Sequence, residues 1–515
     1  MIRYKKFISS IIVIAIMLSF FGCSKAQESS KTTNQTTTQS DVRDDSDMFT
    51  NRDYDSSYDE SSAVKISLSD KGTTCDSENV EINGSTVTIK NEGTYIISGK
   101  LTDGQIIVDI NDADKAQLVL DSVNINCNTS AAIYIKQADK VFITLADKSK
   151  NTLSNKNDFV AIDDNNIDSV IFSKKNLTLN GGGELDITAS YGHGIVSKKD
   201  LKFTSGTYNI DAQEHALQAK NSIRIANGTF NLTANEDGLH SENDDEDNDK
   251  GYIYIIGGLL NISVEDDAIH AGKDLTIKGG TIDIAKCYEG LEGETINISG
   301  GDISLKASDD GLNASDGISS KLSTADPFTA DTNCSITISG GIIRIDADGD
   351  GIDSNGNLTV TGGEIYIDGP TNDGDSALDY DGTATISGGI VVAVGAIGMA
   401  QNFSDGTQCA MLVNASGQAN DEIVLKDSSG KEILTYKPGK NYSCALISCP
   451  EITQGKTYTV MSGNQDIKVT MTETIYGSNG GMGMGMGGSR PPMDNRQPMG
   501  GGAPMGEGHD PFGQP

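Results

Sequence analysis

The chain has 515 residues, 73 acidic and 39 basic, and a formal net charge of −34. A charge this negative excludes direct binding to nucleic acid or to a bare anionic membrane surface, because both would repel the protein over its whole surface. Aromatic residues make up 5% of the chain and Trp is absent, which argues against a sugar-binding module built on a flat aromatic platform, so cations, or polyanions held by cations, are the expected partners.

The first residues have the features of a lipoprotein signal peptide. Three basic residues precede an apolar run from Phe7 to Phe21, and Gly22-Cys23 resembles a lipoprotein cleavage site. We therefore expect a signal peptide at residues 1–22 and lipidation of Cys23. The protein would then lie on the extracellular face of a bacterial cell membrane and contact the membrane through this lipid anchor only. Secretion without a lipid, or an uncleaved apolar anchor, is the alternative. Residues 23–62 are rich in Ser, Thr and Asn and predict a disordered tether.

The middle of the chain repeats a short unit marked by a pair of glycines. Such pairs start at Gly279, Gly300, Gly340, Gly362 and Gly388, and the unit has about 22 residues once an insertion between Asp316 and Cys334 is left out. A unit of this length fits three short strands, and it buries its apolar residues only by stacking on identical neighbours. For residues 63–398 we predict an all-β parallel solenoid, with an antiparallel sandwich as the alternative.

The two segments that follow have a different character. From 399 to 476 the glycine pairs stop, and runs such as Glu422 to Lys426 and Glu432 to Tyr436 are typical of hairpins. We predict a small antiparallel β cap here, because the last coil of a solenoid is an edge that needs covering. Residues 477–515 consist mainly of Gly, Met and Pro and predict a disordered tail.

Acidic side chains recur at two fixed positions of the unit, on either side of a core-facing apolar residue such as Leu217 or Ile352. The residues two positions before the apolar residue form what we call the first column, which comprises His193, His215, Asp237, Asp267, Glu289, Asp310, Asp350 and Ser376. The residues one position after the apolar residue form the second column, which comprises Gln218, His240, His270, Glu292, Asn313, Asp353 and Asp379.

Stacking would bring these carboxylates to within about 5 Å of one another, so the columns need cations. Ca²⁺ is favoured over Mg²⁺, because it accepts six to eight oxygens in irregular geometry. The predicted calcium ligands are Asp237, Asp267, Glu289, Glu292, Asp310, Asp346, Asp348, Asp350, Asp353 and Asp379, with Glu242 and Asp244 in an acidic insertion. The four histidines leave a transition-metal site open, although stacking of a repeat alone would also align them.

Several segments resemble one known family. They are Asp237 to Ile255, Leu378 to Ala384, Gly398 to Gln401 and Asp427 to Leu434. On these residues the chain, from about Ala63 to Tyr476, is similar to clostridial calcium-binding β-helix lipoproteins known as carbohydrate-binding domain-containing proteins, whose fold is similar to that of pectate lyases. The resemblance implies a right-handed parallel β-helix and calcium-dependent binding of acidic plant polysaccharide such as polygalacturonate, with cellulose as a further ligand.

Three functions follow from these observations. In the first, a monomeric surface protein binds the glycan through shared calcium ions without catalysis, with sugar contacts from Lys220, Lys273, Tyr252, Tyr288 and Tyr380. In the second, the protein is a calcium-dependent polyuronate lyase with Lys273 as the general base. In the third, calcium stiffens a surface spacer that has no affinity for glycans.

Overall fold

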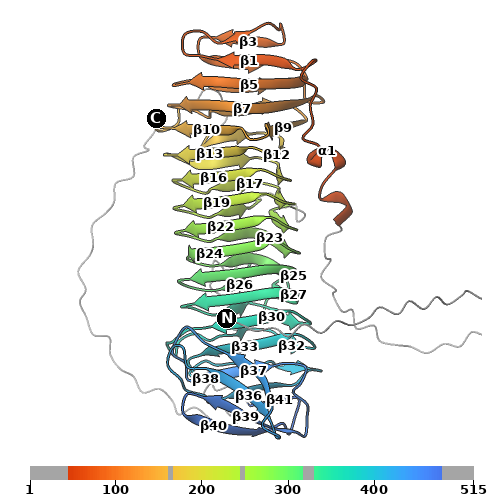
Figure 1. Ribbon diagram of the computed structural model, residues 1–515, viewed down its shortest axis with the longest axis vertical. Coiled ribbons are helices and arrows are strands. Elements are labelled where there is room, and N and C mark those ends of the chain that lie inside the picture. The colour runs from red at the N-terminus through yellow and green to blue at the C-terminus, as the bar shows by residue number, and fades with distance from the viewer. Residues whose placement is uncertain (1–44, 161–165, 244–249, 317–329, 478–515) are drawn as a thin grey trace, which may run out of the picture. The chain divides into compact units, whose positions relative to one another are not determined.

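The computed structural model describes residues 45–160, 166–243, 250–316 and 330–477. The predicted signal peptide, Cys23, most of the tether, Asp244 and nearly all of the predicted tail lie outside the described residues. The described chain is all-β, and most of its strands pair in parallel with the equivalent strand of the next coil (Figure 1). Three faces result, each of them a parallel sheet that runs along the stack.

Face 1 carries the first strand of each glycine-paired unit. It comprises β1 (Val64–Leu68), β5 (Gly93–Leu101), β7 (Lys115–Cys127), β9 (Lys140–Leu145), β12 (Asn176–Gly181), β15 (Asp200–Phe203), β18 (Ser222–Ile225), β21 (Tyr252–Ile255), β23 (Ile269–Ile277), β25 (Leu291–Ala307), β27 (Ser335–Ala347), β29 (Asn357–Val360), β32 (Ala384–Ile386) and β34 (Asp405–Gly406).

Face 2 begins where the chain turns after face 1. It comprises the second parts of β5, β7, β25 and β27 together with β10 (Lys150–Asn155), β13 (Glu184–Ala189), β16 (Thr207–Ala212), β19 (Thr229–Ala234), β22 (Leu259–Val264), β24 (Thr281–Cys287), β30 (Glu364–Asp368) and β33 (Ile390–Gly395).

Face 3 has the shortest strands and carries the two columns. It comprises β4 (Thr86–Ile89), β6 (Gln105–Asp109), β8 (Ile133–Gln137), β11 (Ser169–Ser173), β14 (His193–Ser197), β17 (Leu217–Ala219), β20 (Leu239–Ser241), the first residues of β23 and β25, β26 (Leu312–Ala314), β28 (Ile352–Ser354) and β31 (Asp379–Tyr380).

Both ends of the stack have antiparallel strands. At the first end, β2 (Thr74–Cys75) pairs with β1 and β3 (Val80–Asn83) pairs with β4. At the other end, β38 (Cys444–Ser448) lies antiparallel between β33 and β35 (Ala410–Val413), and β35 also pairs with β41 (Ile475–Tyr476). A separate antiparallel sheet follows the order β37 (Glu432–Tyr436), β36 (Ile423–Asp427), β39 (Thr457–Ser462) and β40 (Gln465–Thr470).

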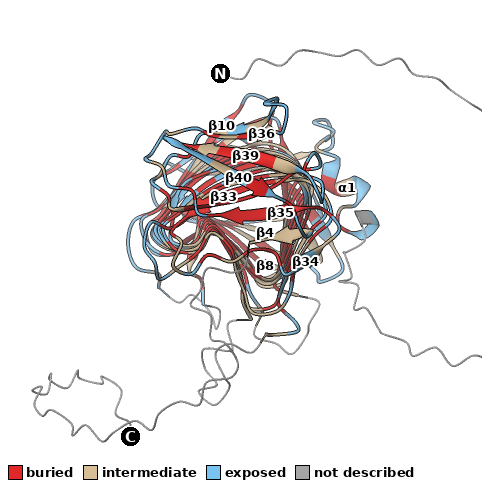
Figure 2. Ribbon diagram, turned by 90° about the horizontal axis from the view of Figure 1, so that it is seen from below, coloured by how far each residue is buried: buried red, intermediate tan, exposed pale blue. Residues whose placement is uncertain are grey.

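The core is a set of apolar rows inside the coils, which Figure 2 shows as buried residues enclosed by exposed turns. On face 1, for example, Ile225, Ile255 and Ile277 pair in register, and each is 0% exposed. Burial of one such side chain stabilises the fold by roughly 1.5–3 kcal/mol. The glycine pairs lie at the corner between faces 1 and 2, where the second glycine has a positive φ, as at Gly280 (φ +100°), which a side chain would disfavour.

The start of the described chain corrects one prediction. Residues 45–62, which we call the N-terminal strap, were expected to belong to the disordered tether. Instead they contain η1 (Asp45–Asp47) and α1 (Asn51–Tyr54), and α1 lies beside β9 and β12 (Figure 1). The reason is Asp53, which is fully buried and ion-paired with Lys140 and Lys202. Neither of these short helices, nor any other described helix, is long and apolar enough to span a membrane.

Candidate functional site

The short strands of face 3 bring both columns into register. The core-facing residues Leu217, Leu239 and Ile269 pair in successive coils, and the row continues to Ile352. The residue after each of them pairs likewise, from Gln218 to Asp379. The alignment inferred from the glycine-paired units is therefore confirmed for the second column.

Hydrogen bonds between side chains and the backbone link the first column from coil to coil. The backbone N–H of Asp237 donates to His215 Nδ1 (3.0 Å), that of Asp267 to Asp237 Oδ1 (3.0 Å), and that of Glu289 to Asp267 Oδ1 (3.1 Å). The same bond joins Asp350 N–H to Asp310 Oδ1 (2.6 Å). Asp237, Asp267 and Asp310 therefore each use one carboxylate oxygen to satisfy the backbone and keep the second for another partner.

One group of carboxylates, which we call the carboxylate cluster, consists of Asp310, Asp350 and Asp353. One carboxylate oxygen from each lies within 4.8 Å of those of the others, as is also the case for Asp237, Asp266 and Asp267. Burial, followed by repulsion from neighbouring carboxylates, raises the pKa of Asp310 to about 6, that of Asp350 to about 8 and that of Asp353 to about 7. In the described part of the chain, none of the three forms an ion pair with Lys or Arg.

Two neighbouring residues extend this cluster. Asn313 pairs in register with Asp353, and its Oδ1 is buried without a hydrogen-bond partner among the described residues. Its Nδ2 donates to Glu289 Oε2 (2.8 Å), and burial with repulsion from Glu292 raises the pKa of Glu289 to about 8. The carboxylate cluster thus has an amide and a further carboxylate next to it along the columns. This donor set fits a hard divalent cation such as Ca²⁺, which takes carboxylate and amide oxygens in irregular geometry.

A second group combines imidazoles with carboxylates. His270 Nδ1 is ion-paired with Glu292 and lies 3.5 Å from Asp267 Oδ2. Burial lowers the pKa of His270, but its bonds to these two carboxylates outweigh burial and raise the pKa to about 11. His240 Nδ1 lies 2.6 Å from Asp237 Oδ2, and its pKa is also raised. In its coil, the protonated imidazole of His270 therefore supplies positive charge to the columns.

The other two histidines lack a free lone pair for a metal ion. His193 Nδ1 accepts the backbone N–H of His215 (3.1 Å), and His215 Nδ1 accepts that of Asp237. The ring proton must therefore lie on Nε2, which faces Glu214 Oε2 (3.0 Å) in His193 and Glu236 Oε2 (3.2 Å) in His215. Burial lowers the pKa of both rings to about 3. The four rings stack at 4.2–5.0 Å between centroids, which favours a structural role for the row over a transition-metal site.

The structure separates the predicted calcium ligands. Asp346 and Asp348 point away from the carboxylate cluster and are ion-paired with Lys440 Nζ (2.6 and 2.8 Å), so the segment from Asp346 to Asp353 does not form one loop site. Asp379 follows Asp353 in the second column and accepts a hydrogen bond from Gln401. Glu242 lies 3.6 Å from His240 Nε2.

The predicted sugar contacts also have different surroundings. Tyr252 is buried beneath the strap, where its hydroxyl meets Met48 Sδ (3.8 Å), so it is not available to a glycan. Tyr380 donates its hydroxyl to the carbonyl of Asn402 (2.6 Å). Tyr288 is 47% exposed, and Lys273 is ion-paired with Glu294. Lys220 lines a hollow next to His240.

Sequence reasoning missed one member of the site. Asn313 was placed in the second column but not among the ligands, because a neutral amide carries no charge signal. Its position between Glu292 and Asp353 in that column was the available clue.

Comparisons with a family model and with a relative give the same description. Residues 83–331 match the model of a family described as carbohydrate-binding domain-containing protein. A protein of Acetivibrio thermocellus with the same description is 46% identical over 201 residues, or 39% of this chain and 70% of that protein. A solved structure described as the polysaccharide lyase-like protein from C. thermocellum, gadolinium derivative, is 33% identical over 50% of this chain and 98% of its own, with a TM-score of 0.42. The chain belongs to the family of carbohydrate-binding domain-containing proteins.

Proposed function

We propose that this protein binds acidic extracellular polysaccharide, such as polygalacturonate, without catalysis and through calcium ions held on face 3. The observation that carries this proposal is the carboxylate cluster, in which Asp310, Asp350 and Asp353 lie together without a Lys or Arg partner in the described chain. A chain with a net charge of −34 repels a polyuronate, so attraction needs cations between the two. An ion held by the cluster would also offer open coordination positions to sugar oxygens.

The proposal includes the setting in which binding takes place. The protein would be a monomeric lipoprotein on the extracellular face of the bacterial cell membrane, attached through Cys23. Its coils would wind in the right-handed sense, as crossover connections between parallel strands nearly always do. Calcium would then act twice, once between coils and once between protein and glycan.

The lyase alternative depends on Lys273. A general base acts in its neutral form, whereas the ammonium of Lys273 is held by Glu294. Among the described residues, no Lys or Arg forms an ion pair with Asp310, Asp350 or Asp353, so none is placed as a base beside the carboxylate cluster. We therefore keep the lyase as the second candidate and include its products in the test.

The test is affinity electrophoresis of the full chain through gels that contain polygalacturonate, in calcium and in chelator, with an assay for unsaturated products. We expect retardation with calcium and no products. The double variant Asp350→Asn/Asp353→Asn should lose about tenfold or more of the calcium-dependent affinity. The matched control is Asp283→Asn/Asp405→Asn, which changes two exposed acids and has the same charge.

Other results would decide between the alternatives. Products would make the protein a lyase and make Lys273→Ala the next variant. Absence of retardation under every condition would contradict glycan binding and leave the calcium-stiffened spacer.

A further inference from the structure

A row of lysines follows the strands of face 3 in the coils before the acidic part of the columns. Strands β8, β11, β14 and β17 pair in parallel, with Ile135, Ser173, Ser197 and Ala219 in register. The residue after each of these is a lysine, and together they form what we call the lysine row, which comprises Lys136, Lys174, Lys198 and Lys220. The backbone keeps the stacking, because Lys198 N–H donates to Ser173 O (2.7 Å) and Lys220 N–H to Ser197 O (3.0 Å). Successive coils lie about 4.8 Å apart, so four ammonium groups share one edge.

Two lysines of the row lie beside acidic side chains at known distances. Lys198 Nζ lies 3.6 Å from Asp168, and Lys136 Nζ lies 3.8 Å from Asp109, which also binds Lys90 (2.9 Å). In the next coils the register continues through Ser241, Ala271 and Gly293, and the residues after them are Glu242, Gly272 and Glu294, so this position no longer carries a lysine. The lysine row therefore ends where the acidic columns begin.

The columns are also less acidic beside the lysine row. In these coils the first column holds the imidazoles of His193 and His215, and the second column holds the amide of Gln218, where later coils have carboxylates. Face 3 thus has a cationic end and an acidic end within one protein. A polyanion would meet opposite conditions at the two ends.

A hollow of about 320 Å³ lies at the last lysines of the row, lined by Lys198, Lys220, Gln218, His240 and Glu242 among others. This volume is in the range of small-ligand sites. Gln218 Oε1 is buried and has no hydrogen-bond partner in the described chain, so a sugar hydroxyl could donate to it. The ammonium groups of Lys198 and Lys220 face the same hollow. The hollow thus combines cations for a carboxylate with an acceptor for a hydroxyl.

We propose that the lysine row and this hollow form a second subsite, which binds the carboxylates of an acidic polysaccharide directly, without a bridging cation. The inference rests on the proposed function and divides it in two. The lysine end of face 3 binds uronate carboxylates by charge-assisted hydrogen bonds, and the acidic end binds them through calcium. The glycan runs along the stack, because both subsites lie on successive strands of the same face.

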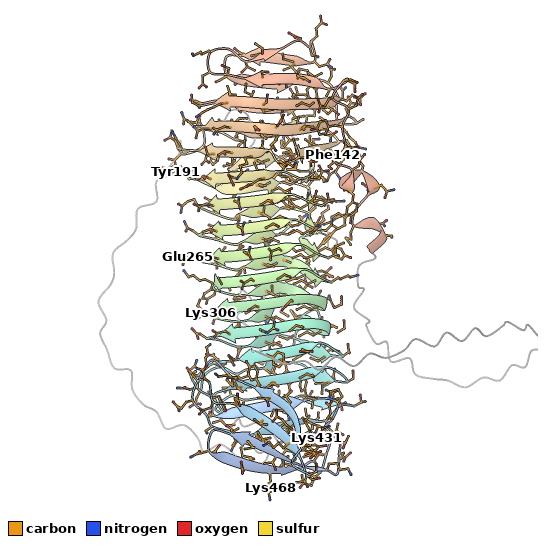
Figure 3. All side chains as sticks on the ribbon, viewed as in Figure 1. Phe142, Tyr191, Glu265, Lys306, Lys431 and Lys468 are labelled. Atoms are coloured by element: carbon orange, nitrogen blue, oxygen red, sulfur yellow. The ribbon has the colours of Figure 1, made fainter. Side chains whose placement is uncertain are left out.

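The test compares two triple variants of the full chain that have the same net charge. The first is Lys174→Gln/Lys198→Gln/Lys220→Gln. The control is Lys286→Gln/Lys306→Gln/Lys468→Gln. Figure 3 labels Lys306 on the stack and Lys468 on the separate antiparallel sheet. Each is electrophoresed through polygalacturonate, through its methyl ester and through a neutral cellulose derivative, in chelator and in calcium. Circular dichroism with thermal unfolding is used to check that both variants are folded.

In chelator we expect the unmodified chain to be retarded by polygalacturonate but not by its methyl ester, which lacks the charged carboxylate. The first variant should bind polygalacturonate about tenfold more weakly in chelator, because it lacks three partly screened ionic contacts, while the affinity of the control stays unchanged. Added salt should weaken the binding that is measured in chelator. Equal affinity of the two variants in chelator, or an unmodified chain that is retarded only with calcium, would overturn the inference and leave the calcium-dependent function standing. Failure of the unmodified chain to bind with or without calcium would overturn both.

Discussion

At the scale of single residues, Asp53 shows how a buried charge positions a polar segment. Its carboxylate accepts hydrogen bonds from Lys140, from Thr178 Oγ1 (2.7 Å) and from the Thr50 backbone (2.8 Å). Burial alone would raise the pKa of Asp53, but these bonds outweigh it and hold the pKa well below its usual range. Arg52 lies over the Phe142 ring at 4.3 Å, and Phe142 lies next to the strap in Figure 3. At α1 the strap is therefore held by a buried ion pair and a ring contact. Before α1, Met48 packs on Tyr252, and its carbonyl accepts a hydrogen bond from Arg224 (3.0 Å).

Asp53→Asn should release the strap. Loss of one partner from a buried ion pair costs about 3–5 kcal/mol, because Lys202 and Lys140 then keep uncompensated charges. A carboxylate with a lowered folded pKa stabilises the fold above its unfolded pKa, near 3.9, and this stability is lost as the pH falls below that value. We expect faster tryptic cleavage after Arg52 in the variant at pH 7, and in the unmodified strap after brief exposure to acid. Asp55→Asn is the control, since Asp55 is exposed, and equal cleavage of both variants would contradict the role given to Asp53.

The residue scale also shows what sequence could not reveal. Asp346 and Asp348 have the spacing of calcium ligands, but their partner Lys440 is about 90 residues away in the chain and comes from the segment after the coils. Asp53 looked like a tether residue because Lys140 and Lys202 lie 87 and 149 residues further along. Periodicity reports contacts between repeats, whereas contacts with segments outside the repeat leave no periodic signal.

At the scale of elements, the columns were predictable because one unit sets the register of the next. The core-facing residue of each face 3 strand is fixed by burial, so its two polar neighbours must stack. Their chemistry then changes along the face, from lysines and neutral histidines through the protonated His270 to carboxylates. The first part of this series was missed, because the prediction followed the acids and considered Lys220 without its neighbours in the row.

Calcium should determine how the stability of these elements depends on pH. In the folded protein without calcium, the pKa values of Asp310, Asp350 and Asp353 are higher than in the unfolded chain. Protonation of these groups therefore stabilises the fold, fully below about pH 4, and this stabilisation is lost as the pH rises towards 8. We expect a lower unfolding midpoint at pH 8.5 than at pH 5 in chelator, measured by thermal circular dichroism. At pH 8.5, calcium at a hundred times its Kd should restore about 2.7 kcal/mol.

Two single variants test whether the carboxylate cluster is responsible for the stabilisation by calcium. Asp353→Asn should abolish most of the calcium effect, whereas Asp283→Asn, an exposed residue of β24, should leave it unchanged. Identical midpoints with calcium and with chelator at pH 8.5 would contradict cation binding at the carboxylate cluster.

At the scale of the whole molecule, the coils form a one-dimensional array in which each coil is stabilised mainly by its neighbours. The antiparallel strands at both ends and the four-stranded sheet after the coils cover edges that would otherwise pair with another chain (Figure 1). A surface of this kind can lengthen by whole units without a new core, which suits a ligand that is itself a repeating polymer.

The strap adds a mechanical consequence to this array. Any tension applied before Asp45 first reaches the contacts of Met48 and Phe49 with β18 and β21, and then α1 beside β9 and β12. These contacts, the Asp53 ion pairs and the Arg52–Phe142 contact would bear the load in turn, while the first strand β1 remains unloaded. When they yield, residues 45–62 become slack and lengthen the chain before Val64 by up to about 60 Å. The strap would thus give way under a sudden pull while face 3 stays folded.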